Sequence, residues 1–92
     1  MLNLREQIIV VSDAYGRLAK QGRKRISTIV LNRGSKLDDI AQGGDLNTAT
    51  FERAMLWFSE NWPKGEEWPS TVPRPSVSLE QFRAAYVGEA AE

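Results

Sequence analysis

The chain has 92 residues, of which 41% are hydrophobic and 26% charged, as is typical of one globular domain with a short extension. It contains neither cysteine nor histidine, which excludes disulfides, thiolate metal sites and the commonest general base. We therefore predict a protein that is not an enzyme and has no catalytic residue, cofactor or metal ion. No apolar run approaches the roughly 20 residues that span a bilayer. The N-terminus also lacks a signal-peptide pattern, so we expect a cytoplasmic protein without membrane contact.

Basic and acidic residues are unevenly placed although they cancel overall, at 12 of each. The first 36 residues hold eight basic and two acidic side chains, whereas the other 56 hold four basic and ten acidic ones. A fold that keeps the first part on one face would present a basic surface, which attracts phosphate groups by Coulomb attraction and counterion release. The alternative is an ordinary solvated surface of uneven charge.

Helical periodicity dominates the start of the chain. Residues 3–21 are predicted as a first helix, with an apolar stripe made of Leu4, Ile8, Val11, Tyr15 and Leu18. Asn3 and Glu6 fit a capping box at its start, and Gly22 fits the left-handed residue that ends a helix. A strand at the β-branched residues around Ile9 is the competing interpretation.

Two short helices are predicted next, over residues 23–32 and about 36–42. The turn between them, 32–35, contains Asn and Gly, which tolerate positive φ, and its serine can cap the second helix. A strand over 27–31 is again the alternative, because these residues favour β structure. The glycine pair 43–44 ends the second short helix.

A fourth helix begins at Asn47 or Thr48 and stops before Pro63. Its periodic apolar positions are the clearest in the chain: Phe51, Ala54, Met55, Phe58 and Trp62. All four prolines follow within residues 63–78, which we predict to be an extended linker. Residues 79–92 complete the chain as a short fifth helix with a frayed end.

The two short helices and their turn have the spacing of a DNA-binding helix-turn-helix. This motif needs apolar residues that lock the helices at a steep angle and a small residue where the backbones approach. Ser27 stands at the small position, and the locking positions are Ile26, Val30, Leu37 and Ile40. The expected fold is all-α. It is a compact four-helix helix-turn-helix domain over residues 1–62, followed by the proline-rich linker and the short C-terminal helix.

Residues 24–62, KRISTIVLNRGSKLDDIAQGGDLNTATFERAMLWFSENW, resemble the λ-repressor-like helix-turn-helix DNA-binding proteins, and in particular small bacterial, prophage-associated members. The shared features are the helix spacing, the break at Gly43-Gly44 and the threonine-led helix TATFERAMLWF. The chain departs from the family at Leu31, where glycine is usual, and Gly34 follows three residues later. The resemblance implies an all-helical transcription regulator that binds duplex DNA through residues on and before the third helix.

Two groups of residues are candidates for contacts with DNA. Basic side chains at the start of the second helix would hold phosphates without reading sequence; they are Lys20, Arg23, Lys24 and Arg25. Base readout would fall to residues in the turn and on the third helix, namely Arg33, Ser35, Lys36 and Gln42. The adjacent acids Asp38 and Asp39 would repel phosphate, so we do not expect them to read bases directly.

A second class of function is an adaptor that binds another protein. Trp62 and Trp68, beside the prolines of the acidic C-terminal half, would form its docking surface. Duplex DNA is nevertheless the partner that the pattern favours. A homodimer is a further partner that we keep open, because one helix-turn-helix rarely gives enough specificity alone.

Overall fold

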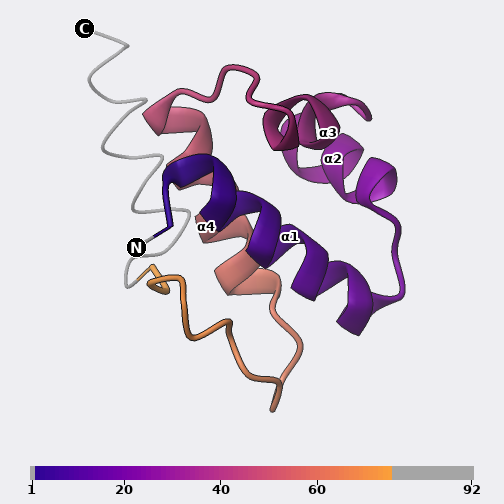
Figure 1. Cartoon of the computed structure of the whole chain (residues 1–92). Helices are drawn as coiled ribbons and strands as arrows, with labels where there is room; N and C mark the ends of the chain where they lie inside the picture. The colour runs from indigo at the N-terminus through magenta and orange to yellow at the C-terminus, as the bar shows by residue number, and fades with distance from the viewer. Residues whose placement is uncertain (1, 76–92) are drawn as a thin grey trace, which may run out of the picture.

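The computed structural model describes residues 2–75, which form four α-helices and no strand (Figure 1). The helices are α1 (Leu4–Ala19), α2 (Arg23–Leu31), α3 (Lys36–Ala41) and α4 (Thr48–Asn61). The all-helical prediction is confirmed for these residues. The strands weighed near Ile9 and over 27–31 are wrong, because both stretches are helical. The predicted fifth helix lies outside the described residues.

The start of α1 matches its predicted capping box, but its end does not match. The Asn3 carbonyl oxygen Oδ1 accepts from the Glu6 amide at 2.8 Å, and Glu6 Oε1 accepts from the Asn3 amide at 3.0 Å. At the other end Lys20, not Gly22, takes the left-handed conformation, with φ 57°. The amides of Lys20 and Gln21 both donate to the Gly16 carbonyl, which closes the helix there. Gly22 is extended instead and precedes α2 as its N-cap.

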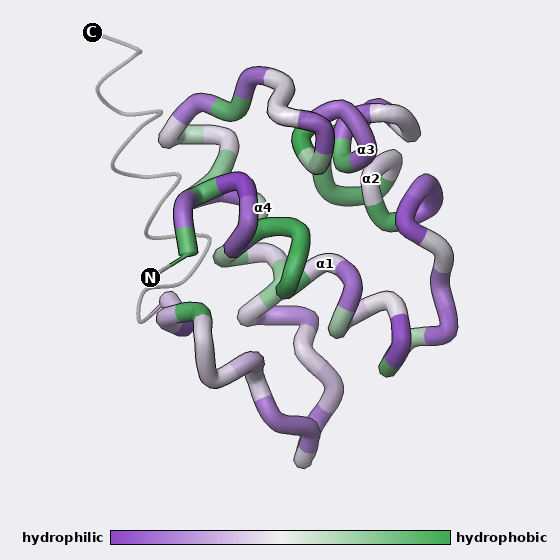
Figure 2. The backbone as a smooth tube through the Cα atoms, viewed as in Figure 1, coloured by the Kyte–Doolittle hydropathy of each residue, from purple (hydrophilic) through white to green (hydrophobic). Residues whose placement is uncertain are grey.

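The core lies between α1 and α4, and α2 and α3 close one end of it (Figure 1). Figure 2 shows hydrophobic stretches along both α1 and α4, and side chains from both helices belong to the buried cluster. The buried cluster takes side chains from every helix: Ile8, Val11, Ile26, Leu37, Ile40, Ala54, Met55 and Phe58. Leu4 and Leu18, the two ends of the predicted stripe, are 38% and 37% exposed because α1 extends past the core at both ends.

The chain after α4 packs back onto the domain. The rings of Trp62 and Trp68 lie 4.8 Å apart, and the Arg74 guanidinium lies 5.1 Å from the Trp68 ring centroid. Arg74 also donates to the Ser59 carbonyl at 2.7 Å, and Val72 is 3% exposed. Residues 63–75, which belong to the predicted linker, contain no helix or strand, and these contacts join them to α4.

Gly16 permits the close contact between α1 and α2. A Cβ at this position would lie 2.7 Å from the Gln21 carbonyl oxygen and 3.0 Å from Ile26 Cδ1. We expect Gly16→Ala to lower the free energy of unfolding by about 1–3 kcal/mol, because a backbone oxygen must move. Helix propensity alone would give a gain of about 1 kcal/mol.

Chemical denaturation of Gly16→Ala and of a matched variant, Gly22→Ala, checks this. A Cβ at Gly22 would meet nothing within 4 Å, and its φ is −77°. The free energy of unfolding of Gly22→Ala should stay within about 0.5 kcal/mol of the parent's. The weaker N-cap lowers it, and the reduced conformational freedom of the unfolded chain raises it by a similar amount. A Gly16→Ala protein as stable as the parent would show that the α1–α2 contact is looser than described.

Candidate functional site

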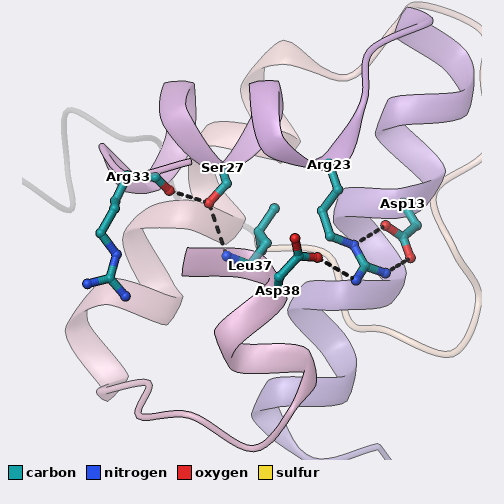
Figure 3. Close-up of polar contacts among 6 residues, drawn as sticks. All are labelled: Asp13, Arg23, Ser27, Arg33, Leu37 and Asp38. Atoms are coloured by element: carbon teal, nitrogen blue, oxygen red, sulfur yellow. Dashed lines mark hydrogen bonds and ion pairs between the residues drawn. The ribbon is translucent and has the colours of Figure 1, made fainter. Parts of the chain in front are cut away.

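The hydroxyl of Ser27 joins α2 to the turn and to α3. The side chain is fully buried, donates a hydrogen bond to the Arg33 carbonyl and accepts one from the Leu37 amide at 3.0 Å (Figure 3). Leu37 stands in the first turn of α3, where amides have no partner within their own helix. Ser27 thus serves as a cap supplied by another helix, and its two hydrogen bonds fix where α3 begins relative to α2.

In the turn 32–35, Asn32 takes the positive φ that the sequence allowed, but Ser35 does not cap α3 as predicted. Asn32 adopts the left-handed conformation, with φ 63°, and its amide donates to the Thr28 carbonyl at 3.1 Å. Ser35 occupies the N-cap of α3, yet its side chain makes no capping hydrogen bond. The predicted capping role is therefore wrong, because Ser27 already satisfies the Leu37 amide. The Ser35 hydroxyl is left exposed at the start of α3.

Removing the Ser27 hydroxyl should lower the stability of the fold more than removing the hydroxyl of the neighbouring Thr28. Ser27→Ala leaves the buried Leu37 amide without its acceptor and leaves the Arg33 carbonyl with only the Lys36 amide as donor, so we expect about 1–3 kcal/mol of lost stability in thermal or chemical unfolding. Thr28→Ala is the control, since this exposed hydroxyl bonds only within α2, to the Lys24 carbonyl. It should cost less than about 0.5 kcal/mol. Equal losses in the two variants would contradict the role given to Ser27.

Arg23, a predicted phosphate contact, is held by two carboxylates. Its guanidinium lies 2.8 Å from Asp13 on α1 and 3.1 Å from Asp38 on α3 (Figure 3). The hydrogen bond to Asp13 does most to raise the pKa of Arg23 above its ordinary value, partial burial opposes this, and Asp38 raises it further. Arg23 therefore stays charged, but its charge is used within the fold to tie three helices together.

The other predicted phosphate contacts carry free charges. Lys20, Lys24 and Arg25 are exposed and form no ion pair with another residue of 2–75. A Cβ at Gly34 would lie 3.1 Å from Lys24 Cγ, so the Lys24 stem lies against the turn. The stretch from the end of α1 into the first turn of α2 is correspondingly hydrophilic in Figure 2. Three cations thus surround the start of α2.

Three of the four candidate base-reading residues line one open hollow beside α3. This hollow, which we call the α3 hollow, is formed by Arg33, Lys36, Asp39, Gln42 and the loop Gly43–Asp45. Gln42 is exposed at the end of α3, and Lys36 Nζ donates to the Asp45 carbonyl at 2.8 Å. Ser35, the fourth candidate, precedes Lys36 in the chain but is not among the residues that line the hollow.

Arg33 and Asp39 form an ion pair at this hollow. Arg33 Nη2 lies 2.7 Å from Asp39 Oδ2, and the two side chains are 58% and 51% exposed. Both acids of α3 are therefore paired with arginines, Asp38 with Arg23 and Asp39 with Arg33. The repulsion of phosphate that the sequence suggested for these acids is reduced by their partners.

Sequence reasoning missed Arg5. Its Nε donates to the Gly44 carbonyl at 2.7 Å, across 39 residues of chain. Arg5 and Lys36 thus bind neighbouring carbonyls of the loop that follows α3, and both line a second open hollow together with Asn47 and Thr50. Carbonyl contacts leave both positive charges unneutralised. No local pattern identifies Arg5, because its partner is a backbone atom distant in sequence.

The two tryptophans of the adaptor hypothesis are used inside the fold. Trp62 is 8% exposed, and its indole N–H donates to the Glu66 carbonyl at 3.2 Å. The indole of Trp68 donates to the Val72 carbonyl at 2.8 Å. Trp62 also lies 6.0 Å from Tyr15, ring centre to ring centre. A partner protein would therefore find little of Trp62 to contact.

Within residues 2–75 no three acidic side chains gather in a way that could hold a metal ion, and no helix has the length and apolar content to cross a bilayer. The chain matches no family model, and comparison with curated proteins and with solved structures gives no match either.

Proposed function

We propose that the chain binds double-stranded DNA through α2, the turn 32–35 and α3, and acts as a regulator of transcription. The observation that carries the proposal is the group of free cations around the start of α2, beside the exposed side of α3. The resemblance to λ-repressor-like proteins points the same way.

The start of α2 is built unfavourably for a helix that meets only water. Its N-cap, Gly22, offers no side-chain acceptor, and its first turn holds three basic residues and no acid. Positive charge at this end opposes the helix dipole and costs a few tenths of a kcal/mol per residue. A bound anion would reverse that cost, because the unpartnered amides of the first turn and the nearby cations would both interact favourably with the anion. A DNA phosphate is such an anion, held by Lys20, Lys24 and Arg25.

The turn and α3 supply the groups suited to base edges. The free Ser35 hydroxyl and the exposed amide of Gln42 each donate and accept hydrogen bonds, and Lys36 donates to guanine O6 and N7. These residues stand at the start and the end of a helix of six residues, which the major groove can admit. Arg33 completes the set when it leaves Asp39. Arg23 holds the helices in place instead of contacting phosphate.

The adaptor function receives no comparable support. Its two tryptophans donate their indole N–H groups to carbonyls of the same chain, and Arg74 covers the Trp68 ring. We therefore favour DNA binding.

Fluorescence anisotropy with a labelled mixed-sequence duplex, measured across a salt series, tests the proposal. The double variant Lys24→Gln/Arg25→Gln should bind roughly tenfold more weakly at low salt, and its slope of log affinity against log salt should fall by about 2. The variant lacks two positive charges, so its binding releases about two fewer counterions from the DNA.

A charge-matched control separates a local site from a general charge effect. Arg53 on α4 and Lys64 after it are exposed, and Arg53→Gln/Lys64→Gln removes the same charge. This control should bind like the parent within about twofold. Equal weakening of both double variants, or no binding by the parent at low salt, would refute the proposed interface.

A further inference from the structure

We infer that Asp39 makes the α3 hollow selective for G·C base pairs, by holding Arg33 until both side chains find new partners on one pair. This inference rests on the proposed DNA binding. It gives Asp39 a role in base recognition that the sequence alone did not lead us to expect.

The geometry separates a fixed backbone from a movable side chain. The Arg33 carbonyl accepts hydrogen bonds from the Ser27 hydroxyl and from the Lys36 amide, the latter at 3.2 Å. Its guanidinium extends away from these contacts, as Figure 3 shows, and is held by Asp39 at 2.7 Å. Arg33 is thus anchored at its main chain, while one exposed carboxylate directs its tip.

An exposed ion pair of this kind is weak and can be exchanged. Two side chains more than half exposed gain little from each other in water, so other groups can replace Asp39 as the acceptor for Arg33. Phosphate can take Arg33 at any sequence, but the Asp39 carboxylate is then left without its cation beside a polyanion. This unpaired carboxylate weakens any DNA contact of Arg33 in which Asp39 gains no hydrogen-bond donor.

A G·C pair is the arrangement that satisfies both side chains. Guanine offers O6 and N7 to an arginine, and the cytosine amino group donates to a carboxylate. An A·T pair has an amino group that can donate to Asp39, but it lacks two adjacent acceptors for the Arg33 guanidinium. Arg33 therefore gains less by leaving Asp39 for an A·T pair or for a phosphate than it gains by leaving Asp39 for guanine.

The test uses two duplexes of equal length, one all G·C and one all A·T, with anisotropy at one low salt concentration. Asp39→Asn removes the charge but keeps the backbone, whose carbonyl accepts from the Gly44 amide at 2.7 Å. We expect its affinity for the A·T duplex to rise about threefold to tenfold, while that for the G·C duplex changes less than about twofold. Circular dichroism and a thermal melt confirm that each variant is folded.

Asp45→Asn is the matched control, because Asp45 lines the same hollow and its carboxylate forms no ion pair with another described residue. It should raise both affinities by one common factor. Asp39→Asn is also measured in an Arg33→Gln background, where its preference for the A·T duplex should vanish. This double-mutant cycle separates the effect of the Arg33–Asp39 interaction from the effect of removing the Asp39 charge.

The outcomes separate the two proposals. Identical behaviour of Asp39→Asn and Asp45→Asn, or selectivity that persists in the Arg33→Gln background, would overturn the inference and leave DNA binding intact. If the parent and every variant bind neither duplex, both proposals are wrong.

Discussion

The buried hydroxyl of Ser27 controls the part of the molecule to which we assign function. Helices of nine and six residues are too short to be stable in isolation, so α2 and α3 take their order from tertiary contacts. Ile26, Leu37 and Ile40 supply the buried apolar surface, but hydrophobic contact does not fix direction. Hydrogen bonds from the Ser27 hydroxyl to the Arg33 carbonyl, and from the Leu37 amide to Ser27, set the register between the helices. The positions of Arg33, Ser35 and Lys36 relative to α2 follow from that register.

The surface charge of this protein depends on which basic residues the fold pairs with acids or carbonyls, and not on their number along the sequence. The excess of basic residues in the first 36 positions suggests one cationic face. Arg23 and Arg33, however, are paired with acids from α3, and Arg5 and Lys36 bind backbone carbonyls. Of the basic residues in the first 36 positions, those left without such contacts among residues 2–75 lie near the end of α1 and the start of α2. The basic surface is therefore smaller than the count indicates and is concentrated around the start of α2.

Local patterns predicted the helices well, because their signals lie within a few residues. The expected starts at Asn3, 23, 36 and Asn47 or Thr48 agree with the structure to within one residue, and so do the predicted ends of α2, α3 and α4. The end of α1 was less accurate, since Lys20 takes the left-handed conformation expected of Gly22. Propensity alone gives no warning of this. The Gly16 carbonyl, which accepts from two amides, determines where the helix closes.

The site was predicted only in outline, because its decisive contacts join residues far apart in the chain. Ser27 was chosen for its size, whereas its importance lies in a hydroxyl that caps another helix. Arg5 was missed altogether, and so were the two carboxylates that hold Arg23, which lie 10 and 15 residues away along the chain. The contacts of the proline-rich segment could not be predicted for a similar reason. Trp68, Val72 and Arg74 hold it against α4 through contacts that composition does not reveal.

The most direct measurement is a two-dimensional amide NMR spectrum recorded while a mixed-sequence duplex is added at low salt. The shifts should change at residues 20–25 and 33–44, and the changes should reverse as salt is raised. Amides in the C-terminal half of α4 and over 63–75 should stay unchanged. Shifts confined to α4 and the segment after it, or no change at all, would contradict a DNA-binding surface on α2 and α3.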